Sequence, residues 1–91
     1  MCAPREGMDG DKRIVYILES TGNPERHYVG ITSDLRQRLA WHNAGQNVHT
    51  ANDRPWVVIV SLQFRTEGAA RAFERYLKSG SGRAFAKKHF P

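Results

Sequence analysis

The sequence predicts an α+β domain in which two or three helices flank a small, mainly antiparallel sheet of three strands. Its expected order is β-β-α-β-α with a short last helix. Three short runs are rich in β-branched and aromatic residues and are bounded by turn-forming or polar residues, as strands are. Two other segments follow a capping residue and repeat apolar residues at three-to-four spacing, as amphipathic helices do. A length of 91 residues allows one domain with one modest core.

The first two predicted strands form a hairpin with a long loop. They cover residues 13–18 (RIVYIL) and 27–31 (HYVGI), and the turn-forming sequence Gly22-Asn23-Pro24 lies between them. Side chains alternate between the two faces of a strand, so Tyr16 points away from the face that Val15 and Ile17 share. Each strand of the hairpin therefore contributes one tyrosine, Tyr16 and Tyr28.

The first predicted helix begins at Ser33 as its N-cap, with Asp34 beside the positive end of the helix dipole, and ends at Gly45. Arg38 and His42 are four residues apart and should lie one above the other on one face. The adjoining buried stripe is marked by Leu35 and Leu39.

The following residues 46–55 are polar, and they form either a solvated connector or a loop on the substrate side. Residues 56–64 (WVVIVSLQF) are the most continuous apolar run of the chain. Their short length and β-branching favour a strand, and apolar residues on both faces suggest that this strand is central in the sheet.

Thr66 should cap the second helix, in which Glu74 lies at the edge of the apolar stripe. Residues 80–82 (GSG) should break this helix, and residues 83–89 can form one or two further turns. The apolar stripe of the second helix consists of Ala69, Ala70, Phe73, Tyr76 and Leu77.

These elements carry a known set of motifs. The triplets at 14–16 (IVY) and 28–30 (YVG), followed by Arg38 and His42, resemble the motifs of the GIY-YIG nuclease superfamily. The resemblance extends over about residues 13 to 90 and is closest to small single-domain bacterial members, which resemble the nuclease domains of an excision-repair enzyme and of intron homing endonucleases. Ile14 replaces the glycine of the family name. Residues 73–83 are similar to the second-helix region that carries the metal-binding glutamate of the family, here Glu74.

The resemblance implies the same α+β fold and a metal-dependent DNA endonuclease. It implies that Tyr16 lies near the attacking water, that Tyr28 helps to hold the water and the phosphate, and that Glu74 is the sole protein ligand of Mg²⁺ or Mn²⁺. A guanidinium can bind phosphate oxygens with two hydrogen bonds and stays charged, which suits Arg38 to the transition state. His42 would stabilise charge beside it.

Each of these residues also has a structural interpretation. Tyrosines pair across hairpins without any catalytic role. Arg38 could belong to a solvated face, and His42 could be a core or surface imidazole. Glu74 could form an ion pair at helical spacing with Arg71 or Lys78.

The charge of the chain predicts a polyanionic partner. Fourteen Lys and Arg against nine Asp and Glu give a net charge of +5, and no acidic residue follows Glu74. DNA is the expected partner and RNA the alternative. The predicted phosphate-contacting residues, for which a solvated basic surface is the alternative, are Arg36, Arg54, Arg75, Lys78, Arg83, Lys87 and Lys88.

Residues 1–11 are expected to be a flexible tail and residues 12–91 the domain. Cys2 is the only cysteine, which suits a reducing cytoplasm, and no apolar run has the length of a membrane helix. We expect a monomer or weak homodimer. Two other functions fit the sequence: a non-catalytic nucleic-acid-binding domain, and a nuclease that depends on a protein partner.

Overall fold

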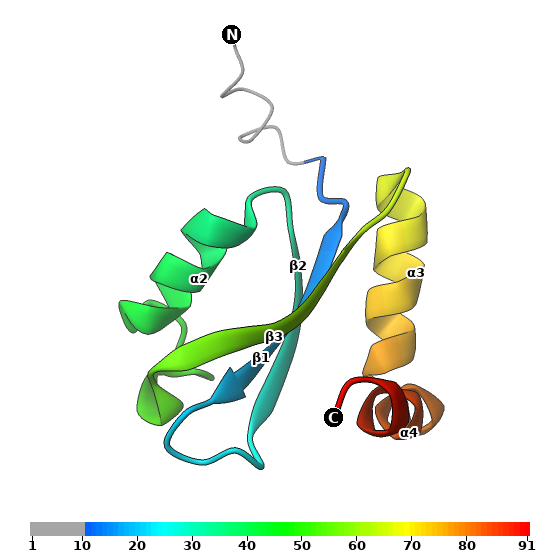
Figure 1. The fold of residues 1–91 in the computed structure, drawn as a ribbon. Helices are drawn as coiled ribbons and strands as arrows, with labels where there is room; N and C mark the ends of the chain where they lie inside the picture. Colours follow the sequence, from blue (N-terminus) through cyan, green and yellow to red (C-terminus); the bar gives the residue numbers. More distant parts are fainter. Residues whose placement is uncertain (1–10) are drawn as a thin grey trace, which may run out of the picture.

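The computed structural model describes residues 11–91, so nearly all of the predicted tail at 1–11 lies outside the described residues. Three strands and three helices follow the predicted order, which confirms the α+β fold (Figure 1). No helix in this part of the chain combines the length and the apolar character needed to cross a membrane. The elements are β1 (Ile14–Ser20), β2 (His27–Thr32), α2 (Leu35–Asn43), a 3-10 turn η1 (Ala51–Asp53), β3 (Trp56–Gln63), α3 (Glu67–Leu77) and α4 (Gly80–His89).

The sheet is antiparallel and has the order β2-β1-β3, so the central strand is β1 and not β3. The prediction of a central strand at 56–64 was therefore wrong. β3 is apolar on both faces because each face of this edge strand is covered by a helix layer. Val58 packs in the core on the α2 side, whereas Ile59 and Val60 pack in the core on the side of α3 and α4.

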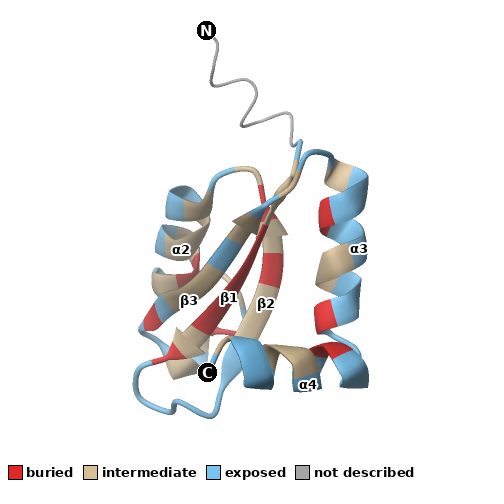
Figure 2. Ribbon diagram, turned by 45° about the vertical axis from the view of Figure 1, so that its right-hand side comes forward, coloured by how far each residue is buried: buried red, intermediate tan, exposed pale blue. Residues whose placement is uncertain are grey.

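The sheet separates two apolar cores, with α2 on one face and α3 and α4 on the other (Figure 1). On the face of α3 and α4, Val15 and Ile17 pack with Ala70 and Leu77. On the α2 face, a second core is built around Tyr16, Leu18 and Trp56, with Leu35 and Leu39 packed against it. The buried residues of β1 form the centre of both layers (Figure 2).

Helix α2 begins one residue later than the sequence indicated. Its N-cap is Asp34 and not Ser33, because the Asp34 carboxylate accepts a hydrogen bond from the backbone N–H of Gln37. Gly45 follows the end of the helix with φ of 83°, a left-handed conformation that glycine adopts without strain.

Helix α3 is capped by Thr66, as predicted, but Ala69 and Tyr76 of its predicted buried stripe are exposed. The break between α3 and α4 lies at residues 78 and 79, and residues 80–82 form the first turn of α4 instead of ending α3. Gly82 is buried against the backbone carbonyl of Tyr76, where a Cβ would collide. Gly82 therefore allows α4 to pack closely against the end of α3.

Candidate active site

The two tyrosines meet at β2, an edge strand of the sheet. Tyr16 lies opposite Gly30 in the pairing of β1 with β2, and the phenol ring extends across this glycine. A Cβ at position 30 would overlap the hydroxyl end of the Tyr16 ring. Gly30 is therefore the residue that leaves room for Tyr16 to reach across β2.

Replacing this glycine tests the close approach. Gly30→Ala should lower the stability by about 1–3 kcal/mol, because the buried ring of Tyr16 has to move. For a domain of this size each kcal/mol corresponds to roughly 4–8 °C in Tm, which thermal melting followed by circular dichroism can resolve. Gly22→Ala is the matched control, since no atom lies within 4 Å of a Cβ at that position. Equal melting of the two variants would contradict the packing described.

Tyr16, His42 and Thr50 form a chain of hydrogen bonds in the α2-side core. The hydroxyl of Tyr16 lies 3.0 Å from Nε2 of His42, and Nδ1 of the same ring lies 2.9 Å from Oγ1 of Thr50. His42 and Thr50 are completely buried and Tyr16 is 2% exposed. His42 is held there because α2 turns this position toward the sheet.

Burial also determines the charge states of the pair. It lowers the pKa of His42, and the nearby Arg38 guanidinium lowers it further, so the imidazole is neutral at pH 7. Burial raises the pKa of Tyr16 above that of an ordinary phenol. Tyr28 and Glu74 add to this increase in the pKa of Tyr16, whereas Arg38 opposes it. The structure thus pairs a protonated phenol with a neutral imidazole.

Arg38 and Tyr28 are half-buried residues of the candidate site. The Tyr28 ring lies 4.7 Å from the His42 ring and 6.4 Å from the Tyr16 ring, measured between centroids. The Arg38 guanidinium lies over the Trp41 ring at 4.5 Å, a cation–π contact that orients it. Tyr28 and Arg38 are therefore more accessible to a substrate than Tyr16 and His42.

Glu74 lies on the helix that packs against the opposite face of the sheet from Tyr16. It belongs to α3, its side chain is 16% exposed, and its Oε2 lies 2.7 Å from Nζ of Lys78. Of the two ion-pair partners that the sequence offers, the structure shows Lys78, while Arg71 pairs with Glu67. The negative charge of Glu74 adds to the raised pKa of Tyr16, after burial and the charge of Tyr28.

The residues fit one kind of metal site. Within residues 11–91 no group of three or more His, Cys, Asp and Glu side chains lies close enough together to hold a metal ion. Mg²⁺ and Mn²⁺ accept single carboxylates and complete their shells with water and phosphate oxygens. Glu74 is compatible with this type of loosely held ion, and it would exchange Lys78 for the metal.

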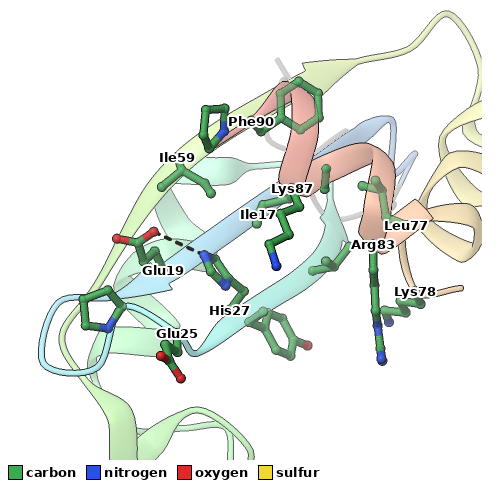
Figure 3. A pocket seen from close by; sticks show the side chains of 15 residues that line it. Ile17, Glu19, Glu25, His27, Ile59, Leu77, Lys78, Arg83, Lys87 and Phe90 are labelled. Atoms are coloured by element: carbon green, nitrogen blue, oxygen red, sulfur yellow. Dashed lines mark hydrogen bonds and ion pairs between the residues drawn. The ribbon is translucent and has the colours of Figure 1, made fainter. Parts of the chain in front are cut away.

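A broad groove with a volume of about 1230 Å³ opens on the face of the sheet that α3 and α4 cover and shares Tyr28 with the site (Figure 3). Tyr28 lines it, and its floor is apolar, with Ile17 and Ile59 among the residues of the sheet. The wall formed by the ends of α3 and α4 is basic, and the opposite wall carries an ion pair between Glu19 and His27. The basic residues of this groove are Lys78, Arg83 and Lys87.

The seven residues predicted to contact phosphates are all exposed, but the groove brings together three of them. Arg54 lies elsewhere, because its Nε donates to the carbonyl of Ala51 and its guanidinium packs against Gly45. Arg36, Arg75 and Lys88 do not line the groove.

Two residues of the site were missed by sequence reasoning. Thr50 lies in a polar stretch that resembles a connector, and its only local signal is a hydroxyl eight residues after His42. Trp41 is adjacent to His42 and three residues from Arg38, a spacing that places it beside the guanidinium on the helix.

Comparison with known proteins identifies the family of this chain. Residues 12–88 match the model of the GIY-YIG catalytic domain. The chain is 38% identical over 71 residues to the structure-specific endonuclease subunit SLX1 of Candida dubliniensis, a match that covers 70% of this chain and 25% of that protein. It is 36% identical over 70 residues to a UPF0213 protein of Haloquadratum walsbyi, with 76% of each chain covered. A UPF0213 protein of Streptococcus pneumoniae is 34% identical over 68 residues, which cover 74% of this chain and 67% of the relative. The chain therefore belongs to the GIY-YIG family.

Proposed function

We propose that this chain is a metal-dependent endonuclease that hydrolyses phosphodiester bonds in DNA. The observation that carries the proposal is the hydrogen bond between the Tyr16 hydroxyl and Nε2 of His42, in a chain of the GIY-YIG family where the charges of Arg38 and Glu74 act on the pKa of the phenol. It supports water activation next to a phosphate-binding guanidinium.

The proposed proton transfer uses Tyr16 and His42 as one unit. The attacking water gives a proton to the Tyr16 oxygen while the proton of Tyr16 passes to Nε2 of His42. The resulting hydroxide forms the new bond to phosphorus, and the bond to the leaving oxygen breaks. The leaving oxygen takes a proton from solvent, and the proton on His42 departs through Tyr16. This route avoids a free phenolate, which burial disfavours.

The complete burial of His42 changes the role expected from the sequence. An imidazole with no exposed surface is not placed to contact a phosphate. We therefore propose that His42 accepts the proton of Tyr16 and does not stabilise the charge of the phosphate directly. That stabilisation falls to Arg38, whose guanidinium is half-buried and oriented by Trp41. Tyr28, on the accessible side of the pair, would hold the water and the phosphate.

Glu74 would hold the divalent ion, Mg²⁺ or Mn²⁺, which when bound would supply positive charge to the phosphate oxygens. A single carboxylate should bind such an ion weakly without DNA. The Lys78 ammonium that now pairs with Glu74 would then be released toward the groove that it lines, where it can contact DNA.

The basic wall of the groove is the proposed DNA-binding surface, and its contribution can be measured. Three groove cations should give a slope of log K against log salt concentration of about −2.7 or steeper on duplex DNA. Lys87→Gln should reduce the slope by about 0.9, whereas Lys88→Gln, on the same helix but outside the groove, should reduce it less. Fluorescence anisotropy with labelled DNA provides the measurement. Equal effects of the two substitutions on the slope would contradict the proposal that DNA binds in the groove.

The relatives suggest a substrate class. The Candida relative is named a structure-specific endonuclease subunit, and this chain spans a quarter of its length. We propose that branched DNA is among the substrates of this chain and that a role in DNA repair or processing follows. A protein partner for targeting is part of the same proposal, because that relative is named as a subunit.

One incubation tests the function. Purified protein is mixed with branched, single-stranded, duplex and supercoiled DNA in Mg²⁺ or Mn²⁺, and the products are separated on denaturing gels. Metal-dependent cuts should occur in at least one substrate. Salt-sensitive binding without cuts in any metal would favour the non-catalytic DNA-binding domain, and cuts that need an added protein would favour the partner-dependent nuclease.

A further inference from the structure

We propose that Thr50 is a positioning residue that fixes the tautomer of His42, so that Nε2 stays free to accept the proton of Tyr16. The inference rests on the proposed function and extends it to a residue of the loop between α2 and β3. The loop would then influence the reaction through the His42 ring, without contact with the substrate.

The geometry leaves His42 two partners, one on each ring nitrogen. Nδ1 lies 2.9 Å from Oγ1 of Thr50, and Nε2 lies 3.0 Å from the hydroxyl of Tyr16. A neutral imidazole carries one proton, so one nitrogen donates and the other accepts. The partner of Nδ1 therefore determines whether Nε2 donates a hydrogen bond or accepts one.

Thr50 favours the tautomer with the proton on Nδ1. Oγ1 of Thr50 lies 3.5 Å from the carbonyl oxygen of Asn47, so the hydroxyl proton can turn to that acceptor and leave a lone pair of Oγ1 to accept from Nδ1. In this arrangement Tyr16 donates to Nε2 and each hydroxyl proton has an acceptor. In the opposite tautomer both Nε2 and the Tyr16 hydroxyl would present a proton across the same 3.0 Å contact, unless Tyr16 turned its proton elsewhere.

The position of Thr50 is fixed by its surroundings. Its carbonyl accepts a hydrogen bond of 2.8 Å from Nε1 of the buried Trp56, and its N–H donates to the carbonyl of Asn47. Trp56 is held in turn by Asn43 of α2, whose side chain bonds both the N–H and the carbonyl of Trp56. Thr50 is thus linked by hydrogen bonds through Trp56 and Asn43 to α2, the helix that carries His42.

The test compares Thr50→Val, which keeps the shape and removes the hydroxyl, with Thr50→Ser, which keeps the hydroxyl. Without an acceptor on Nδ1 the ring should prefer the proton on Nε2, and kcat should fall by about 10² because the proton path is blocked. KM and the metal-free affinity for DNA should stay unchanged, since Thr50 is completely buried. Thr50→Ser should retain kcat within roughly threefold, well below the effect of a lost proton-transfer group.

A second measurement needs neither activity nor a variant. Nitrogen-15 spectra of the histidine rings distinguish a nitrogen that carries a proton from one that does not, and His42 is the one buried histidine in the described part of the chain. The wild-type protein should show the proton on Nδ1. A proton on Nε2, or equal kcat for wild type and Thr50→Val, would overturn the assignment. An inactive wild type that shows the proton on Nδ1 would instead count against the proposed function alone.

Discussion

Glu74→Gln should abolish cleavage in both Mg²⁺ and Mn²⁺. The substitution is nearly isosteric and keeps the packing of the side-chain stem, but it removes the charge that a hard cation requires. Because a bound ion contributes several kcal/mol to the stabilisation of the transition state, the rate should fall by about 10³ or more. Metal-free DNA binding should be kept or tightened, since a negative charge near the phosphates is gone. Cleavage, binding and Tm are measured on the same preparation.

The control for this variant lies on the same helix. Glu67 pairs with Arg71 at the spacing by which Glu74 pairs with Lys78, so Glu67→Gln removes a similar ion pair away from the site. It should leave cleavage intact. Loss of the Glu74–Lys78 pair should cost no more than about 1 kcal/mol, because Lys78 is half exposed. If Glu74→Gln cleaves normally and merely melts earlier, Glu74 is an ion-pair residue and not a metal ligand.

Tyr16→Phe should reduce cleavage by about 10² or more, because the hydroxyl that links the water to His42 is lost. The same change should lower the stability by about 1–3 kcal/mol, since Nε2 of His42 remains buried without its partner. Single-turnover cleavage and thermal melting report the two effects separately.

Tyr76→Phe removes a hydroxyl from an exposed tyrosine on α3 and should change neither quantity appreciably. A Tyr16→Phe protein that cuts at the wild-type rate would return Tyr16 to the role of a core residue. A lower Tm is expected whether Tyr16 transfers a proton or only packs in the core. The cleavage rate therefore distinguishes the two roles.

The parts of the fold that depend on local pattern could be predicted from sequence. β-branching defined the strands, and the hydroxyl of Thr66 marked the start of α3. The rest depends on packing between distant segments. Apolar residues on both faces of β3 indicated burial but not which strand was central, because helices also cover the edge strand. Two neighbouring capping residues, Ser33 and Asp34, could not be ranked without the backbone angles that the structure gives to Asp34.

In the candidate site, too, local spacing could be predicted from sequence, whereas contacts between distant segments could not. The spacing of Tyr16, Tyr28, Arg38 and His42 identified residues that the structure does bring together. Thr50 could not be predicted because its role depends on the path of a loop, and the groove is lined by residues of all three strands and of α3 and α4. The metal ion, the catalytic roles and the cytoplasmic location stay predictions.

The division of the interior by the sheet has a consequence for how the activity could evolve. Tyr16 belongs to one apolar core and contacts His42 by a hydrogen bond, while the helix that carries Glu74 packs on the other core. Substitutions in separate cores that share no partners usually have additive effects on stability. Changes on α3 and α4 that keep Glu74 and adapt these helices to a new DNA shape should therefore leave the packing around Tyr16 and His42 largely unaffected. One small scaffold could in this way diversify its substrates while conserving its chemistry.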